Sequence, residues 1–166
     1  GEIIMEFRKL ENGNIHEVES KYVKEWKDKD ILKETIENRK DCPDFVFYDG
    51  PIYANAKPGI HHVFAKTIKD AFCKYKTMSG YRVLRKIGLD THGLPIEVNV
   101  EKKLGFKNKN DIEKLGIEKF CEECKIETDS NIDEVKKVTD MMGQFIDCDH
   151  PYVTCSNDYI ESEWWI

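Results

Sequence analysis

Apolar residues recur at three- and four-residue intervals near the start of the chain, directly after Asn14, a residue type that favours the N-cap of a helix. The residues with this spacing are Ile15, Val18, Tyr22 and Trp26. Because such spacing places side chains on one face, the sequence predicts a helix with one buried face. A second, short helix is predicted after Asp30, and the Cys42-Pro43-Asp44 segment ends the helical pattern.

A continuous apolar run of strand length comes next, from Phe45 to Tyr48. Residues 49–59 are rich in Gly, Pro and Asn, so they are predicted to form a loop. Apolar residues then follow helical spacing from 60 to 78, and Gly80 stands where a helix would end. A second strand is predicted at 81–84. Strand, loop, helix and strand in this order predict a βαβ unit with parallel strands and a right-handed crossover.

A second glycine-bearing loop, residues 88–95, follows the second strand and leads into a helix predicted at 96–104. Because the carboxyl ends of neighbouring parallel strands meet at one edge of a sheet, both loops are predicted to face the same crevice. The remainder is predicted to be mainly helical. Its expected core residues, at helical spacing, are Val135, Val138, Met142 and Phe145. Residues 151–154 are predicted to be extended, and a terminal helix carries Trp164 and Trp165.

The predicted fold class is therefore α/β, with a Rossmann-like parallel sheet, flanking helices and a helical N-terminal extension. A chain of 166 residues with 40% hydrophobic content can bury one core of ordinary size. The expected organisation is a helical extension at residues 1–43 and a main domain at residues 44–166.

Charge is unevenly distributed along the chain. The net charge of -6 argues against a free-standing domain that is held to nucleic acid by bulk electrostatics. The segment from Lys57 to Lys86, however, contains eight Lys and Arg residues and a single acidic residue, Asp70. This local basic field suits a small polyanion such as ATP, although a solvated helix face accounts for some of the lysines as well.

The cysteines and the apolar runs indicate a cytoplasmic protein without a membrane partner. No apolar run approaches the roughly 20 residues that span a bilayer, and residues 1–6 do not resemble a secretion signal. The six cysteines are accordingly expected to be reduced. Only Cys121 and Cys124 form a CxxC pair, and a structural zinc site needs two more ligands, so no metal site is predicted.

The first loop carries candidate chemistry at the start of the following helix. A helix that begins near Ile60 presents unpaired N–H groups and the positive end of its dipole to an anion. His61 and His62 lie in this first turn, where an imidazole can donate a hydrogen bond to phosphate. From the pattern alone, a phosphate site and a purely structural role remain alternatives. Metal ligation is disfavoured because adjacent helix residues point about 100° apart.

The second loop contains Asp90 and His92. The Asp90 carboxylate would face the crevice, where it can hold an ammonium group or a ribose hydroxyl. Alternatively, Asp90 caps its own turn or the following helix. His92 is a turn residue or a site residue.

Several segments, in this order and at this spacing, resemble isoleucyl-tRNA synthetases of class I. They are Phe47-Tyr48-Asp49-Gly50-Pro51, Tyr53-Ala54-Asn55, Lys66-Thr67-Ile68-Lys69-Asp70, Met78-Ser79-Gly80-Tyr81, Asp90-Thr91-His92-Gly93-Leu94-Pro95-Ile96-Glu97 and Val100-Glu101-Lys102-Lys103-Leu104-Gly105. The resemblance runs from about Phe45 to Trp165, and the segment that begins at Asp90 is its most specific part. Leucine and valine synthetases of class I share the architecture but differ in these segments.

The resemblance implies roles for individual residues. The first loop and helix start match the family's HIGH signature, which binds ATP and stabilises the phosphoryl transition state. His62 matches the last histidine of HIGH. Two other positions of the signature differ: Gly59 stands where HIGH has its first histidine, and His61 stands where it has glycine. The implied ATP-binding residues are thus Gly59, His61, His62 and, from the basic segment, Lys57, with His61 and His62 as the catalytic pair.

For the amino acid, Gly50 and Pro51 match the wall of the isoleucine pocket, and Asp90 matches the carboxylate that holds the amino group. Two positions depart from the family pattern: Ile52 replaces a proline and Leu89 replaces a tryptophan. The family's Lys-Met-Ser-Lys-Ser motif, editing insertion and anticodon-binding domain are absent from the 166 residues, which match the first half of the catalytic domain.

The implied function is activation of isoleucine with ATP and Mg²⁺ to isoleucyl-adenylate, followed by transfer to tRNA(Ile). The 166 residues alone are expected to be inactive. Two alternatives remain. One is a non-catalytic ATP-binding, amino-acid-binding or regulatory module derived from a synthetase. The other is a non-synthetase nucleotidyltransferase of the same fold, which the Asp90 segment disfavours.

Overall fold

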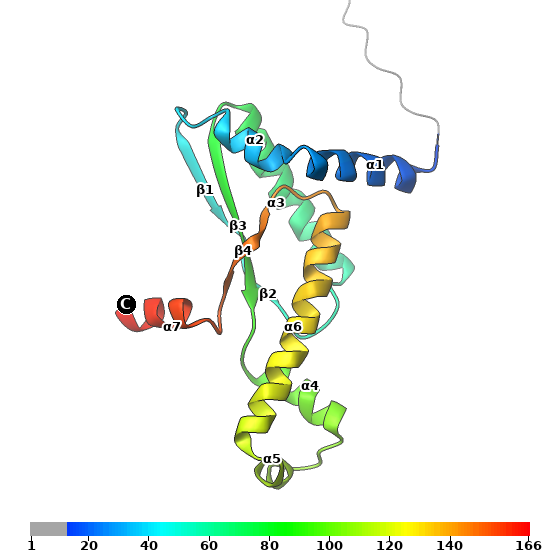
Figure 1. Ribbon diagram of the computed structural model, residues 1–166, viewed down its shortest axis with the longest axis vertical. Coiled ribbons are helices and arrows are strands. Elements are labelled where there is room, and N and C mark those ends of the chain that lie inside the picture. Colours follow the sequence, from blue (N-terminus) through cyan, green and yellow to red (C-terminus); the bar gives the residue numbers. More distant parts are fainter. Residues whose placement is uncertain (1–12) are drawn as a thin grey trace, which may run out of the picture.

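The computed structural model describes residues 13–166 (Figure 1). Two helices come first, α1 (Ile15–Asp28) and α2 (Ile31–Glu37). The next elements are β1 (Asp44–Tyr48), β2 (Ile52–Tyr53), α3 (Ile60–Met78) and β3 (Arg82–Asp90). The last are α4 (Leu94–Leu104), α5 (Lys109–Leu115), α6 (Ile117–Met141), β4 (Asp147–Val153) and α7 (Asn157–Trp165). This order confirms the predicted α/β class.

The strands form a parallel sheet with β3 at its centre. The strands β1 and β2 follow one another along one side of β3, and β4 pairs with the other side. Lys86 of β3 pairs with Tyr48 of β1 on one side and with Asp147 of β4 on the other. Leu89 of β3 likewise pairs with Ile52 of β2 on one side and with Val153 of β4 on the other. The predicted βαβ unit from β1 through α3 to β3 is therefore confirmed.

Two segments that the sequence assigns to loops belong to the sheet. β3 continues through residues 88–90 because Leu89 is fully buried in the core. Gly88 fits this strand because the ring of Tyr152 lies over it, and a Cβ at this position would overlap the ring. The short strand β2 forms inside the first predicted loop, where Ile52 is buried. The loop prediction is thus wrong at both places, since these apolar side chains join the sheet.

The core lies between the sheet and α6. Its buried residues are Ile52, Ile87, Leu89, Val135 and Ile146. The prediction that Val135 is a core residue is confirmed, and α6 runs along the sheet with α4 and α5 against its first half (Figure 1). The sheet edge that carries the two predicted loops is therefore backed by a helix.

The N-terminal helices pack against the end of α6 and the segment that follows it. Asn14 caps α1 as predicted, because its side chain accepts a hydrogen bond from the N–H of His16. Trp26 contacts Phe145 edge-on with ring centroids 5.1 Å apart. Ile15 is exposed and no residue of α1 is fully buried, so the apolar face of α1 is less buried than its spacing predicts. Residues 1–12 of the predicted extension lie outside the described residues.

α3 turns most of its apolar stripe outward. More than half of each of these side chains is exposed: Ile60, Phe64, Ile68, Phe72, Tyr75 and Met78. We call these six residues the exposed α3 face. The residues of α3 that are buried are Lys66, Cys73 and Thr77. An apolar stripe on a globular helix ordinarily faces a core, so this surface is an unusually large uncovered apolar patch.

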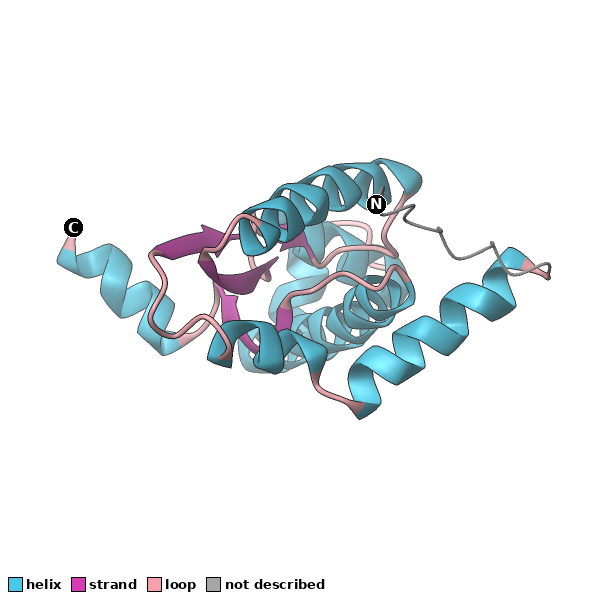
Figure 2. Ribbon diagram, turned by 90° about the horizontal axis from the view of Figure 1, so that it is seen from above, coloured by secondary structure: helices cyan, strands magenta, loops and turns pink. Residues whose placement is uncertain are grey.

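α7 projects away from the sheet at the opposite end of the molecule from α1 (Figure 2), and its Trp164 and Trp165 are exposed. Within residues 13–166, no helix combines the length and the apolar character needed to cross a membrane.

Candidate functional site

The first turn of α3 holds the imidazole pair. Gly59 is the N-cap, and its backbone N–H donates to Nδ1 of His62 at 3.0 Å. The rings of His61 and His62 have centroids 3.9 Å apart. Gly59 makes this arrangement possible, because a Cβ there would stand 2.8 Å from Cε1 of His61. For the N–H groups of Ile60 and His61, no partner is found among the described residues, so they remain available to an anion.

The environment of His62 sets its protonation state and its tautomer. Burial lowers the pKa of His62 below its ordinary 6.5, and the neighbouring His61 and Lys66 lower it further. Because Nδ1 accepts a hydrogen bond, the proton of the neutral ring lies on Nε2. Near neutral pH, His62 can therefore donate one hydrogen bond through Nε2.

We expect an imidazole-nitrogen NMR titration of the chain to show His62 as the Nε2–H tautomer with a midpoint below pH 6.5. A lowered folded pKa means that His62 favours the folded state above about pH 6.5. This contribution is lost as the pH falls below that value toward the folded pKa. The His62→Gln variant assigns the signal. A midpoint at or above 6.5 would contradict the pKa lowered by burial and neighbouring charge, and an Nδ1–H tautomer would contradict the described hydrogen bond.

The second loop holds Asp90 at the end of β3. The Asp90 side chain is 28% exposed, and its Oδ1 accepts from Oγ1 of Thr154 at 3.3 Å. Thr154 is buried and also contacts the N–H of Thr91 and the ring of His92. The helix α4 has Gly93 as its N-cap and no side-chain cap, so Asp90 does not serve as a cap for that helix. The Asp90 carboxylate is thus partly exposed at the carboxyl end of β3, with Nδ1 of His92 3.6 Å from its Oδ1.

The two loops adjoin each other. Tyr53 of β2 lies opposite Asp90 in the sheet register, and its hydroxyl donates to the carbonyl of His92. The N–H of Ala54 donates to the carbonyl of Asp90 at 2.8 Å. Burial raises the pKa of Tyr53, and the nearby Asp90 adds to this effect, so the hydroxyl remains a donor. His92 thus takes part in joining the loops.

The first loop is also tied to the helices behind it. The side-chain amide of Asn99 on α4 donates to the carbonyl of Asn55, and that of Asn131 on α6 donates to the carbonyl of Ala54. These bonds fix the loop between β2 and α3 from two sides. Sequence reasoning identified the loop but not these anchors, because neither asparagine is near it in sequence.

The remaining predicted site residues lie along the first loop. Gly50 and Pro51 are exposed and follow β1 after one residue, Asp49. Lys57 is exposed on the surface, with Nζ 3.8 Å from Oε2 of Glu134 on α6. Lys57 is thus near an acidic side chain of α6.

Asp49 immediately precedes the Gly50-Pro51 segment and is buried between two lysines of α3. Its Oδ2 is 2.8 Å from Nζ of Lys66, and its Oδ1 is 2.6 Å from Nζ of Lys69. All three residues lie in the segments of family resemblance, but the sequence analysis did not predict that they meet. A carboxylate that directly follows a strand and two lysines three residues apart on the next helix are the only available signal.

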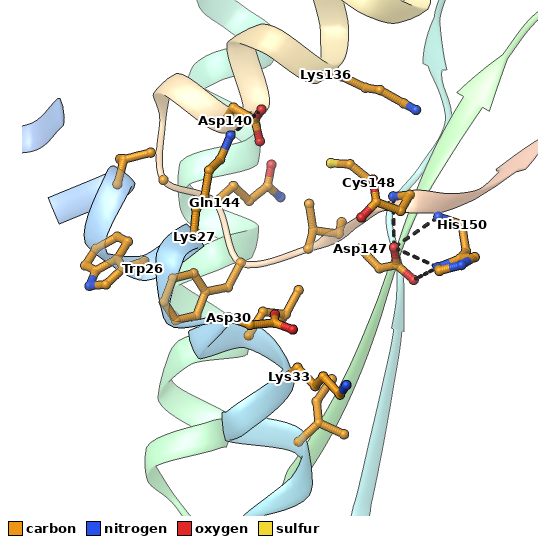
Figure 3. A pocket seen from close by; sticks show the side chains of 17 residues that line it. Trp26, Lys27, Asp30, Lys33, Lys136, Asp140, Gln144, Asp147, Cys148 and His150 are labelled. Carbon is orange, nitrogen blue, oxygen red and sulfur yellow. Dashed lines mark hydrogen bonds and ion pairs between the residues drawn. The ribbon is translucent and has the colours of Figure 1, made fainter. Parts of the chain in front are cut away.

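Two cavities lie beside this region, and neither is lined by His62 or Asp90. One, of about 590 Å³, borders Thr91, His92 and Gly93 and extends between α4, α5 and α6. Cys124 lines it, and burial raises the pKa of its thiol to about 11. The other, of about 730 Å³, lies between the N-terminal helices and the start of β4, where Lys27 meets Asp140 and His150 meets Asp147 (Figure 3).

A comparison with protein families decides what these loops belong to. A family model described as class I tRNA synthetases (I, L, M and V) matches residues 21–166. The chain belongs to this class I synthetase family. The match covers the adjoining loops and all of the predicted site residues.

Curated relatives of this synthetase chain are much longer than the chain itself. An isoleucine–tRNA ligase of Clostridium novyi is 46% identical over 160 residues, which are 96% of this chain and 15% of the relative. One of Bacteroides thetaiotaomicron is 41% identical over 96% of this chain and 14% of the relative. An isoleucine–tRNA ligase 2 of Bacillus cereus is 47% identical over 86% of this chain and 14% of the relative. The chain spans about 15% of the length of these relatives.

A solved structure has the same fold as this synthetase chain. It is the LeuRS chain of a ternary complex of LeuRS, tRNA and LeuAMS from Agrobacterium radiobacter, with a TM-score of 0.66 and 20% identity. The likeness covers 89% of this chain and 17% of the LeuRS chain. It confirms the predicted architecture of a parallel sheet with flanking helices.

Proposed function

We propose that this chain is part of a cytoplasmic isoleucine–tRNA ligase, which activates isoleucine with ATP and transfers it to tRNA(Ile). The names and the identity of the relatives support the amino acid. The observation that carries the proposal is the junction of the two loops, where Tyr53 lies opposite Asp90 and bonds to His92. At this junction the Asp90 carboxylate lies at the same end of the sheet as the loop that leads from β2 to α3, the helix that begins with the imidazole pair.

We also propose that residues 1–43 form a helical extension and residues 44–166 form the first half of the catalytic domain, before the editing insertion. The exposed α3 face supports this organisation, because an apolar stripe of this extent ordinarily packs against further protein. In the complete ligase, the second half of the domain would provide that cover.

The proposed phosphate site is the start of α3. Nε2–H of His62, the free N–H groups of the first turn and the ring of His61 would contact the phosphates of ATP, with Gly59 allowing the close approach. Lys57 would supply charge nearby once it leaves Glu134. In phosphoryl transfer the protein mainly positions the reactants and stabilises the developing charge. Mg²⁺ would enter bound to the ATP phosphates.

The proposed amino-acid site lies at the ends of β1 and β3. Asp90 would hold the ammonium group of isoleucine by a charge-assisted hydrogen bond. Gly50 and Pro51 would form one wall of the side-chain pocket. The substrate carboxylate then attacks the α-phosphate of ATP and pyrophosphate leaves. A hydroxyl of the terminal ribose of the tRNA then attacks the acyl carbon of the adenylate, the new ester forms and AMP leaves.

Isoleucine-dependent exchange of pyrophosphate into ATP tests this function. We expect the full-length parent protein to catalyse the exchange and the 166-residue chain to show little or none, because the chain lacks the second half of the proposed active site. Valine and leucine at equal concentration serve as controls for the amino acid. Absence of exchange by the parent would favour the non-catalytic module instead.

A further inference from the structure

Asp49 is held by three elements of the fold. Its side chain is only 2% exposed, and both carboxylate oxygens pair with lysines of α3, Lys66 and Lys69. Its N–H donates to the carbonyl of Lys86 on β3 at 2.9 Å, and its carbonyl accepts from the hydroxyl of Tyr152 on β4. Every polar atom of Asp49 therefore has a partner, and those partners surround it.

This ion cluster is costly to bury. Removing charges from water has a penalty that their mutual attraction often does not recover, so a buried ion pair is weak evidence for stability as such. Lys66 is almost completely buried, whereas the Lys69 side chain is 36% exposed. A cluster that contributes little net stability but fixes one geometry fits a role in positioning better than a role in holding the fold together.

The position of the cluster indicates what it orients. Asp49 directly precedes Gly50 and Pro51, and a Cβ on Gly50 would stand 4.0 Å from Nζ of Lys69. Lys66 lies one helical turn after His62 on α3. The cluster thus joins the Gly50-Pro51 segment to the helix that begins with the imidazole pair.

We propose that Asp49, Lys66 and Lys69 act as positioning residues that fix the Gly50-Pro51 wall relative to α3, and hence the amino acid relative to ATP. This inference rests on the proposed function. We call the three residues the Asp49 clamp. They do not contact substrate themselves but act through the two residues after Asp49. A loosened wall would bind the isoleucine side chain less tightly in the ground state and in the transition state alike, and such a loss raises KM while kcat changes little.

The test is pyrophosphate exchange by the full-length parent with Lys69→Met. Lys69 is the partly exposed member, and Asp49 keeps Lys66 as a partner, so the variant retains the fold. We expect the KM for isoleucine to rise about tenfold, while kcat and the KM for ATP stay within about twofold. Lys69→Arg keeps the charge and the donors, and its KM for isoleucine is expected to lie within about threefold of the wild-type value. Lys103→Met, which removes a surface ion pair between α4 and Glu127 of α6, is the matched control and is expected to change none of these constants.

The possible outcomes separate this inference from the function on which it rests. An active parent whose isoleucine KM is unchanged by Lys69→Met would overturn the clamp and leave the function intact. A similar impairment of kcat, of the KM for isoleucine and of the KM for ATP, together with a lower melting temperature, would overturn the clamp in favour of a merely structural role. A wild-type parent without isoleucine-dependent exchange would overturn the function and the clamp together.

Discussion

Asp90→Ala in the full-length parent is expected to lower kcat/KM for isoleucine by about 10- to 150-fold, mainly through a higher KM. The reason is the loss of a hydrogen bond between a carboxylate and an ammonium group, a type of bond that contributes about 1.5–3 kcal/mol. This bond exists in the ground state as well as in the transition state, so its loss weakens binding more than turnover. The measurement is steady-state pyrophosphate exchange at varied isoleucine and saturating ATP.

Two further variants show whether the effect comes from the charge of Asp90 or from its contact with Thr154. Asp90→Asn keeps an oxygen that can accept from Thr154 but lacks the charge, and it is expected to impair the reaction nearly as strongly. Asp140→Ala removes an exposed carboxylate paired with Lys27 beside the N-terminal helices, and it is expected to have no effect. Unchanged kinetics in both Asp90 variants would remove the assigned role.

Gly88→Ala is expected to destabilise the chain by about 1–3 kcal/mol, the usual cost of overpacking a core. A Cβ at this position overlaps the ring of Tyr152, and Tyr152 cannot retreat freely because its hydroxyl donates to Asp49 and its ring stacks on Tyr159. For a chain of this size the loss corresponds to a melting temperature lower by roughly 2–4 °C per kcal/mol. Thermal denaturation followed by circular dichroism measures it.

A double variant tests the cause of that loss. In a Tyr152→Ala background the ring is gone, so adding Gly88→Ala is expected to cost much less than it does in the natural chain. Gly13→Ala is the control glycine, since the nearest atom to its Cβ is Cγ2 of Val18 at an ordinary 3.8 Å. Equal costs of Gly88→Ala in both backgrounds would show that the ring contact is not responsible.

The sequence predicted the elements whose signals are local. The helical spacing after Asn14, the loop between the first strand and α3, and the βαβ order all depend on residues close together in the chain. The boundaries of β3 were missed because Gly88 suggests a turn, whereas a distant ring, that of Tyr152, explains a glycine in a strand. The outward orientation of the exposed α3 face could not be predicted either, because spacing shows that apolar residues share a face but not what covers it.

The candidate site was predictable as a set of residues but not as a geometry. His62 and Asp90 could be located from the helix start and the strand end. Their supports come from far along the chain: Thr154 contacts Asp90 across 64 positions, and Tyr53 reaches His92 across 39. Such contacts depend on the parallel register of the sheet, which composition and periodicity do not specify.

The central claim is that the two loops serve one substrate pocket, with phosphate at the start of α3 and the amino group at Asp90. A structure of the full-length parent with a non-hydrolysable isoleucyl-adenylate analogue tests it most directly. We predict Nε2 of His62 within about 3 Å of the group that replaces the phosphate, and a carboxylate oxygen of Asp90 within about 3 Å of the amino nitrogen. An analogue bound with either residue turned away from it, or with the two on opposite sides of the protein, would contradict the account.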